Sequence, residues 1–179
     1  MFVAIEKERR APIWGPLSLS IYTSFEIVRN LLPLYNNYLC MSNSNPILTD
    51  KAAKPLGLYP HSRKVGDLLF LSGIGPRKAG TDEIPGLKLD KYGNYLEFDF
   101  AAQVRSVFDN VKTVLEESGS SWDKLVDVTV YLVNMKRDFH IYNQLYAEYF
   151  KDAMPCRTTV EVSSLPSSIS IELKCIATV

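Results

Sequence analysis

The C-terminal stretches Pro155–Pro166 (PCRTTVEVSSLP) and Ser170–Ala177 (SIELKCIA) predict two strands. Apolar and polar residues alternate along both, as in strands that bury one face. The Leu-Pro-Ser-Ser sequence between them interrupts the pattern. Arg157 and Glu172 occupy polar positions in the two strands. If the strands pair as a hairpin centred near residues 164–165, these two side chains lie roughly opposite each other.

Arg157 and Glu172 allow two interpretations. A guanidinium opposite a carboxylate is often a cross-strand ion pair on a surface, and the alternation alone favours this one. The same pair could instead form a small catalytic site, in which the cation holds a substrate carboxylate and Glu172 handles a proton. Motifs elsewhere in the chain favour the catalytic interpretation.

Several blocks of sequence, in the right order, resemble the reactive intermediate deaminase family, also called Rid or YjgF. Gly66–Gly73 (GDLLFLSG) is the first block, and the two C-terminal stretches supply the others. The resemblance covers roughly residues 51–179. Within the family the chain is most similar to 2-aminomuconate deaminases, through the segments Lys54–His61 (KPLGLYPH), Ile84–Gly86 (IPG) and Tyr131–Met135 (YLVNM).

Composition and charge are those of an ordinary globular protein. The chain has 179 residues, of which 46% are hydrophobic, and this suits one compact domain. Twenty basic residues balance twenty acidic ones, and no stretch concentrates positive charge. We therefore expect no nucleic-acid partner. A net charge of zero also fits a protein that buries surface in an oligomer.

The cysteines and histidines predict neither a metal site nor a disulfide. Three cysteines and two histidines are widely spaced and form no cluster with metal-ligand spacing. A reducing compartment is the default, so we expect a cytoplasmic protein, with a mitochondrial one as the alternative. We expect His61 and His140 to be solvated. The apolar stretch 17–39 contains charged and amide side chains, so we expect no membrane span.

Residues 1–50 differ from the rest and are expected to be an N-terminal extension to a domain at 51–179. They contain no alternating strand, and Met41 stands where a family member of ordinary length could begin. An over-extended start, a targeting presequence and an extra helix at Ser24–Leu32 are the alternatives for residues 1–40.

The domain itself is expected to be α+β, with the order ββαβαββ. Gly66-Asp67 joins two strands at 62–65 and 68–72, and a polar loop follows at 73–98. One helix begins after Asp99 and ends at Gly119, and Asp138 is a possible cap for the second. The amphipathic helices should cover one face of the sheet. The resemblance implies a chorismate-mutase-like fold and a homotrimer with clefts between its subunits.

The resemblance also assigns the site. In the family the residue matching Arg157 binds the carboxylate of the substrate, and we expect Glu172 to remain ionised beside it, orienting water and moving protons. Arg157 and Glu172 are expected from one subunit and Tyr59 from a neighbour. No metal or organic cofactor is needed, because an imine carbon is already electrophilic. The expected substrate-binding residues are Tyr59, Ser72, Gly73, Asn143 and Thr159.

The expected activity is hydrolytic deamination of a reactive enamine or imine that carries a carboxylate, either 2-aminoacrylate-like or 2-aminomuconate-like. The products are a 2-keto acid and ammonia. An endoribonuclease or translation inhibitor is one alternative. A non-catalytic trimer that binds small carboxylates is the other, although such a protein has no need of Glu172.

Overall fold

A computed structural model of the protein describes residues 45–81 and 83–179. The alternatives for residues 1–40 concern residues outside this range. Within it, no helix is both long and apolar enough to cross a membrane. β1 (Pro46–Ile47) pairs with the next strand, so the sheet begins inside the segment 1–50 that we expected to be an extension.

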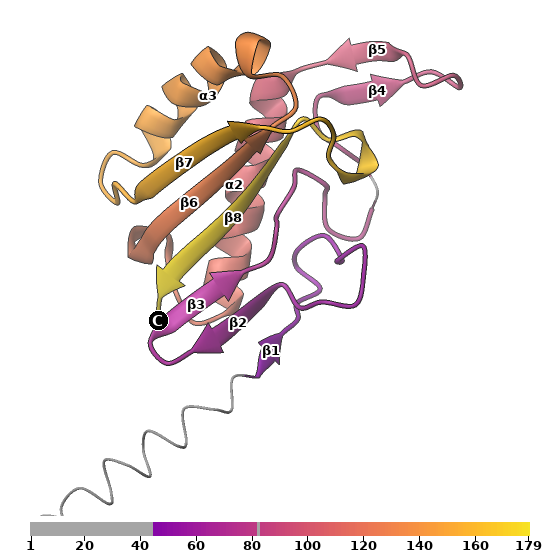
Figure 1. The fold of residues 1–179 in the computed structure, drawn as a ribbon. Helices are drawn as coiled ribbons and strands as arrows, with labels where there is room; N and C mark the ends of the chain where they lie inside the picture. Colours follow the sequence, from indigo (N-terminus) through magenta and orange to yellow (C-terminus); the bar gives the residue numbers. More distant parts are fainter. Residues whose placement is uncertain (1–44, 82) are drawn as a thin grey trace, which may run out of the picture. The chain divides into compact units, whose positions relative to one another are not determined.

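The main sheet has six strands in the order β1-β2-β3-β8-β6-β7 (Figure 1). All neighbours are antiparallel except β6 and β7, which run parallel. The predicted hairpin is present, and its turn residue Gly66 has a φ of 61°. The remaining strands are β2 (Ser62–Val65), β3 (Leu68–Leu71), β6 (Leu125–Leu132), β7 (Cys156–Glu161) and β8 (Ile171–Thr178).

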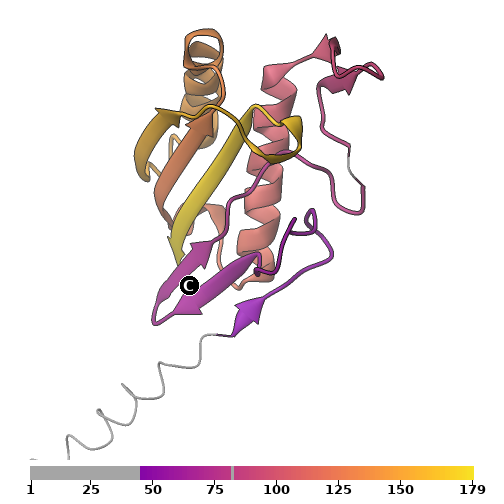
Figure 2. The same cartoon turned by 45° about the vertical axis from the view of Figure 1, so that its right-hand side comes forward.

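Two long helices, α2 (Phe100–Glu117) and α3 (Met135–Tyr149), lie on the same side of this sheet (Figure 2). Asp99 caps α2 as predicted, because its carboxylate accepts a hydrogen bond from the Ala102 amide at 3.0 Å. The predicted cap for α3 is wrong. Asn134 caps that helix, whereas Asp138 is buried inside it and bound by Arg137 at 2.7 and 2.8 Å.

The apolar core lies between the helices and one face of the sheet, which we call the helix face. Val128, Val130 and Leu173 on this face are fully buried. They belong to one core cluster with the apolar residues of α2. Residues at the intervening positions, such as Thr129, Tyr131 and Lys174, lie on the opposite face, which we call the open face. The expected α+β arrangement, with helices on one face, is confirmed.

The segment expected to be a polar loop at 73–98 contains a second, two-stranded sheet. Its strands are β4 (Leu87–Leu89) and β5 (Tyr95–Phe98). The Arg137 guanidinium lies over the Phe98 ring, 4.0 Å from its centre, and this contact ties β5 to α3. Single 3₁₀ turns, η1 (Trp122–Lys124) and η2 (Pro166–Ser168), precede β6 and β8.

The expected pairing of the two C-terminal strands is wrong, because β6 lies between β7 and β8. Arg157 has Val128 as its partner across β7 and β6, and Glu172 has Tyr131 as its partner across β8 and β6. Partners share a face of a sheet, and residues an odd number of positions apart lie on opposite faces. Arg157 is therefore on the helix face and Glu172 on the open face.

Candidate active site

Arg157 is held by aromatic side chains of α3. The central carbon of its guanidinium lies 4.5 Å from the centre of the Tyr146 ring, 5.7 Å from that of Tyr142 and 6.0 Å from that of Phe139. Cation–π attraction at these distances orients the guanidinium while leaving donors at its edge for a carboxylate. The residue is exposed on the outermost strand, so a ligand can reach it.

Two other predicted residues lie near Arg157. Thr159 follows it on the same face of β7, and its hydroxyl is buried without a hydrogen-bond partner among the described residues. Asn143 lies on α3 at helical spacing from Phe139 and Tyr146, so it shares their side of the helix. We call Arg157, Thr159 and Asn143 the arginine group. It offers hydrogen-bond donors suited to a small anion.

Glu172 is in a different environment from the one expected. It is half-buried on the open face, and burial raises the pKa of its carboxyl. We expected Arg157 to keep this group ionised, but Arg157 lies on the opposite face, two strands away. A raised pKa makes the carboxylate a stronger proton acceptor than an ordinary glutamate.

Gly73 lets the Glu172 carboxylate lie directly against the backbone of the segment after β3. A Cβ atom at position 73 would overlap this carboxylate, so only glycine allows the contact. Backbone hydrogen bonds of 2.8 and 2.9 Å between Ile74 and Leu173 fix the two segments on either side. The position of the Glu172 carboxylate therefore depends on Gly73.

Gly73→Ala is expected to displace the Glu172 carboxylate and to lower kcat by about 10²-fold, the scale for misplacing a reacting group by about 1 Å. Steady-state ammonia release measures this effect. Because Gly73 acts through Glu172, adding Gly73→Ala to Glu172→Gln should cause little further loss. If Gly73→Ala lowers kcat equally in the wild-type protein and in Glu172→Gln, this role of Gly73 is contradicted.

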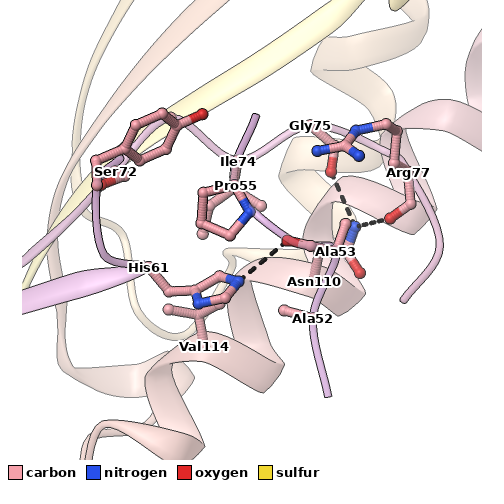
Figure 3. Close-up of a pocket in the computed structure, with 12 residues that line it drawn as sticks. Ala52, Ala53, Pro55, His61, Ser72, Ile74, Gly75, Arg77, Asn110 and Val114 are labelled. Carbon is pink, nitrogen blue, oxygen red and sulfur yellow. Dashed lines mark hydrogen bonds between the residues drawn. The ribbon is translucent and has the colours of Figure 1, made fainter. Parts of the chain in front are cut away.

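Tyr59, Ser72 and Gly73 line a cavity of about 50 Å³. Figure 3 shows Ser72 and His61 together on one side of it. The Ser72 hydroxyl donates to the Pro60 carbonyl at 2.6 Å, and the Tyr59 hydroxyl accepts from the Leu56 amide at 3.2 Å. The first bond holds the segment before β2 against the end of β3, and the second stabilises that segment internally. We call Glu172, Gly73, Ser72 and Tyr59 the glutamate group.

His61 is buried, not solvated as expected. Its Nδ1 accepts from the Thr49 amide at 3.3 Å, so Nε2 carries the proton and donates to the Ala53 carbonyl at 3.0 Å. Both ring nitrogens therefore fix the segment 49–53, of which Ala52 and Ala53 line the cavity. Sequence reasoning missed this role because the partners are backbone atoms, which leave no motif.

The arginine group and the glutamate group are separate within one chain. The strands β7 and β8 that carry Arg157 and Glu172 are two strand spacings apart, or about 10 Å, and the two side chains leave the sheet in opposite directions. One small substrate cannot contact both within a single subunit. Tyr59, which we expected from a different subunit than Arg157, lies with the glutamate group.

Comparison with known proteins identifies the family. The family model described as Endoribonuclease L-PSP matches residues 49–179. A RutC family protein of Pyrococcus abyssi is 40% identical over 131 residues, which are 73% of this chain and 94% of that protein. Reactive Intermediate Deaminase A of Arabidopsis thaliana, a chloroplastic protein, is 33% identical over 132 residues, 74% of this chain and 64% of that one.

Solved structures agree with these relatives. The crystal structure of E. coli TdcF with bound serine has a TM-score of 0.64 and 28% identity, and the match covers 75% of this chain and 98% of that one. The chain belongs to the Rid/YjgF family, which includes the RutC and L-PSP proteins. The family predicted from the sequence is confirmed.

Proposed function

We propose that this protein is a cofactor-independent deaminase, which hydrolyses an enamine or imine bearing a carboxylate to the 2-keto acid and ammonia. The proposal rests on two side chains whose surroundings suit them to this reaction. The guanidinium of Arg157 is oriented by an aromatic ring, and the half-buried carboxyl of Glu172 has a raised pKa. The name of the Arabidopsis relative and the serine in the TdcF structure, a small molecule with an amine and a carboxylate, support it.

The residues divide the work between binding and proton transfer. Arg157 holds the carboxylate next to the reacting carbon through two parallel hydrogen bonds. An enamine first becomes the tautomeric imine, as it gains a proton at its β carbon and loses one from its nitrogen. Glu172 then accepts a proton from water as the water oxygen bonds to the imine carbon. It passes that proton to nitrogen, which gives a carbinolamine with a hydroxyl and an amino group on the same carbon. Glu172 then takes the hydroxyl proton and delivers it to the amino nitrogen, so that the carbonyl group forms as the carbon–nitrogen bond breaks and ammonia leaves.

We further propose that the site forms between subunits of a homotrimer. The arginine group of one subunit would face the glutamate group of the next, because each chain holds the two groups on opposite faces of its sheet. The open face also exposes Phe70, Val126 and Val160, apolar side chains that a neighbouring subunit would cover. The trimer itself rests on the family resemblance.

Arg157→Lys is expected to lower kcat/KM for carboxylate substrates by roughly 30- to 150-fold, or about 2–3 kcal/mol. Lysine keeps the positive charge but lacks the planar fork that binds both carboxylate oxygens. Ammonia release from 2-aminoacrylate generated in situ measures the effect. Arg105→Lys, at an exposed position on α2, is the matched control and should leave the rate unchanged. Comparable losses of kcat/KM in both variants would mean that Arg157 has no specific role in binding the substrate carboxylate.

The same preparation should be assayed for RNA cleavage, because the matching family model is described as an endoribonuclease. Ammonia release that falls in Arg157→Lys, with no RNA cleavage above background, supports the deaminase. RNA cleavage that depends on Arg157, with no ammonia release, would replace the deaminase proposal with that of an endoribonuclease.

A further inference from the structure

A buried glutamine on α2 is bonded to the start of the strand that carries Glu172. Gln103 lies on the apolar side of α2 and is fully buried. Its Oε1 accepts a hydrogen bond from the Ser170 amide at 2.9 Å. Ser170 is itself buried and stands two residues before Glu172, where the chain leaves η2 and begins β8. This bond therefore fixes the start of β8 to the helix.

Hydrogen bonds hold the backbone on both sides of Glu172. After it, Leu173 and Ile74 exchange the two bonds of 2.8 and 2.9 Å. Before it, the Ser170 carbonyl accepts from the Val133 amide at 3.2 Å, and the Ser170 amide donates to Gln103. Of these four bonds, only the one to Gln103 uses a side chain. A substitution at Gln103 can therefore remove one support of Glu172 and leave the others.

The turn before Ser170 has a conformation that nearby contacts must hold. Ser167 and Ser168 have φ angles of 58° and 59°, in the left-handed region that residues other than glycine rarely adopt. Such a conformation persists where the surrounding structure fixes it. The bond from Ser170 to Gln103 lies directly after this turn and is one contact that can do so.

The second polar atom of Gln103 indicates what the residue contributes. Its Nε2 is buried and has no hydrogen-bond partner among the described residues. A buried donor without a partner is destabilising, and a methionine of similar length would carry no such donor. Methionine would, however, leave the buried Ser170 amide without its acceptor. The favourable contribution of the glutamine is therefore its bond to Ser170.

We propose that Gln103 is a positioning residue for Glu172. By fixing the start of β8, it keeps the Glu172 carboxylate against Gly73, where the carboxylate can accept a proton from water. Gln103 does not contact the substrate and acts through the backbone of Ser170 and Ile171. The inference rests on the proposed deaminase function and adds to it a residue of α2 on which the rate depends.

Gln103→Met tests the inference, because it removes the acceptor and keeps the length of the side chain. It should lower kcat for ammonia release by about 10- to 100-fold, the scale for misplacing a reacting group by about 1 Å. Affinity for a non-reactive 2-keto acid depends on Arg157 and should stay near the wild-type value. Added to Glu172→Gln, the change should cause little further loss.

The pH profile of Gln103→Met gives a second readout. Burial raises the pKa of the Glu172 carboxyl, so a carboxyl displaced toward water should take up its proton at a lower pH than in the wild-type protein. The fall of activity at low pH should move to lower pH accordingly. Gln103→Glu still offers the Ser170 amide an oxygen, and it should retain more activity than Gln103→Met.

Two control variants separate positioning from stability. Val107 is one turn further along α2 and fully buried, so Val107→Ala should lower the Tm by leaving a cavity, with kcat and the pH profile unchanged. Gln144→Met makes the same substitution at an exposed position of α3 and should change none of these. If Gln103→Met lowers the Tm but matches Val107→Ala in kcat and pH profile, Gln103 is only structural and the inference is wrong.

Ser170→Pro removes the same hydrogen bond from its other partner, and it replaces Gln103→Met in the test if that variant does not fold. Proline has no N–H to donate, and Ile169 before it already has a ψ of 153°, which suits a residue preceding proline. The loss of kcat and the displaced pH profile should both recur. Wild-type values for both in Ser170→Pro would overturn the inference.

Carbon-13 NMR of the side-chain carboxyls separates this inference from the proposed function, because it needs no turnover. The Glu172 signal is the one missing from Glu172→Gln. If the wild-type protein releases no ammonia, but the Glu172 titration moves in Gln103→Met and not in Val107→Ala, the deaminase proposal fails and the positioning role stands. If ammonia is released and Gln103→Met changes neither kcat nor the titration, the positioning role fails and the deaminase stands.

Discussion

Glu172→Gln is expected to lower kcat for ammonia release by roughly 10²- to 10⁴-fold, the range for loss of a positioned acid or base. Glutamine keeps the shape of the side chain and its fit against Gly73, but it cannot accept a proton from water. Binding of the carboxylate depends on Arg157, so titration with a non-reactive 2-keto acid should give nearly the wild-type affinity. The loss should therefore appear in kcat and not in binding.

The pH dependence of wild-type activity gives an independent readout of the same group. Burial raises the pKa of Glu172, so this carboxyl takes up a proton at a higher pH than an ordinary glutamate. Activity that requires the carboxylate should fall as pH is lowered through this raised pKa. The fall should be absent from the residual activity of Glu172→Gln.

Glu148→Gln is the matched control, because Glu148 is exposed on α3. It should retain wild-type turnover and the wild-type pH profile. If Glu172→Gln turns over at a near wild-type rate, Glu172 is not the proton acceptor, and the proposed mechanism is wrong.

The helices and the first hairpin could be predicted because local patterns specify them. Asp99 precedes an apolar repeat at helical spacing, and Gly66-Asp67 is a two-residue turn between alternating segments. The cap of α3 was misassigned because Asn134 and Asp138 both suit that role. Their burial decides between them: Asp138 is fully buried, which a cap at the surface would not be.

The position of β6 between the C-terminal strands could not be found by alternation. Alternation fixes which residues share a face of one strand, but it does not name the neighbouring strand. The order strand, helix, strand across β6, α3 and β7 was the available signal, because two strands joined through a helix often pair in parallel. Applying it would have placed β7 beside β6, whereas the pairing of β8 with the other edge of β6 has no such local signal.

The contacts that surround the site residues could not be predicted from the sequence. Burial raises the pKa of Glu172, and the place of its carboxylate depends on the backbone at Gly73. The fixed ring of His61 depends on the carbonyl of Ala53 and the amide of Thr49. These contacts join segments that are remote in sequence. Residue types can suggest a carboxylate and a guanidinium, but only the fold determines which of them meet.

Arg157→Met and Glu172→Gln chains, each nearly inactive alone, are expected to recover activity when they assemble together. Methionine keeps an apolar stem to pack on the Tyr146 ring, so this variant should fold. In a cyclic oligomer each shared site takes its arginine group from one subunit and its glutamate group from the next. Random assembly of equal amounts then leaves about a quarter of the sites intact, one half for each contributing chain.

Wild-type chains mixed with the double variant Arg157→Met/Glu172→Gln provide the matched comparison. If sites are shared, an equal mixture should retain about a quarter of wild-type activity, and if each chain holds a complete site it should retain about half. Differently tagged chains, co-expressed and purified through both tags, isolate the mixed trimers. In these, about a third of the shared sites are intact for the two single variants, and about a sixth for wild type with the double variant, against about half if each chain holds a complete site. Mixed oligomers of the two single variants that stay inactive would contradict the shared site. The physical reason to expect recovery is the position of β6, which keeps the two groups apart in every chain and leaves a neighbouring subunit to bring them together.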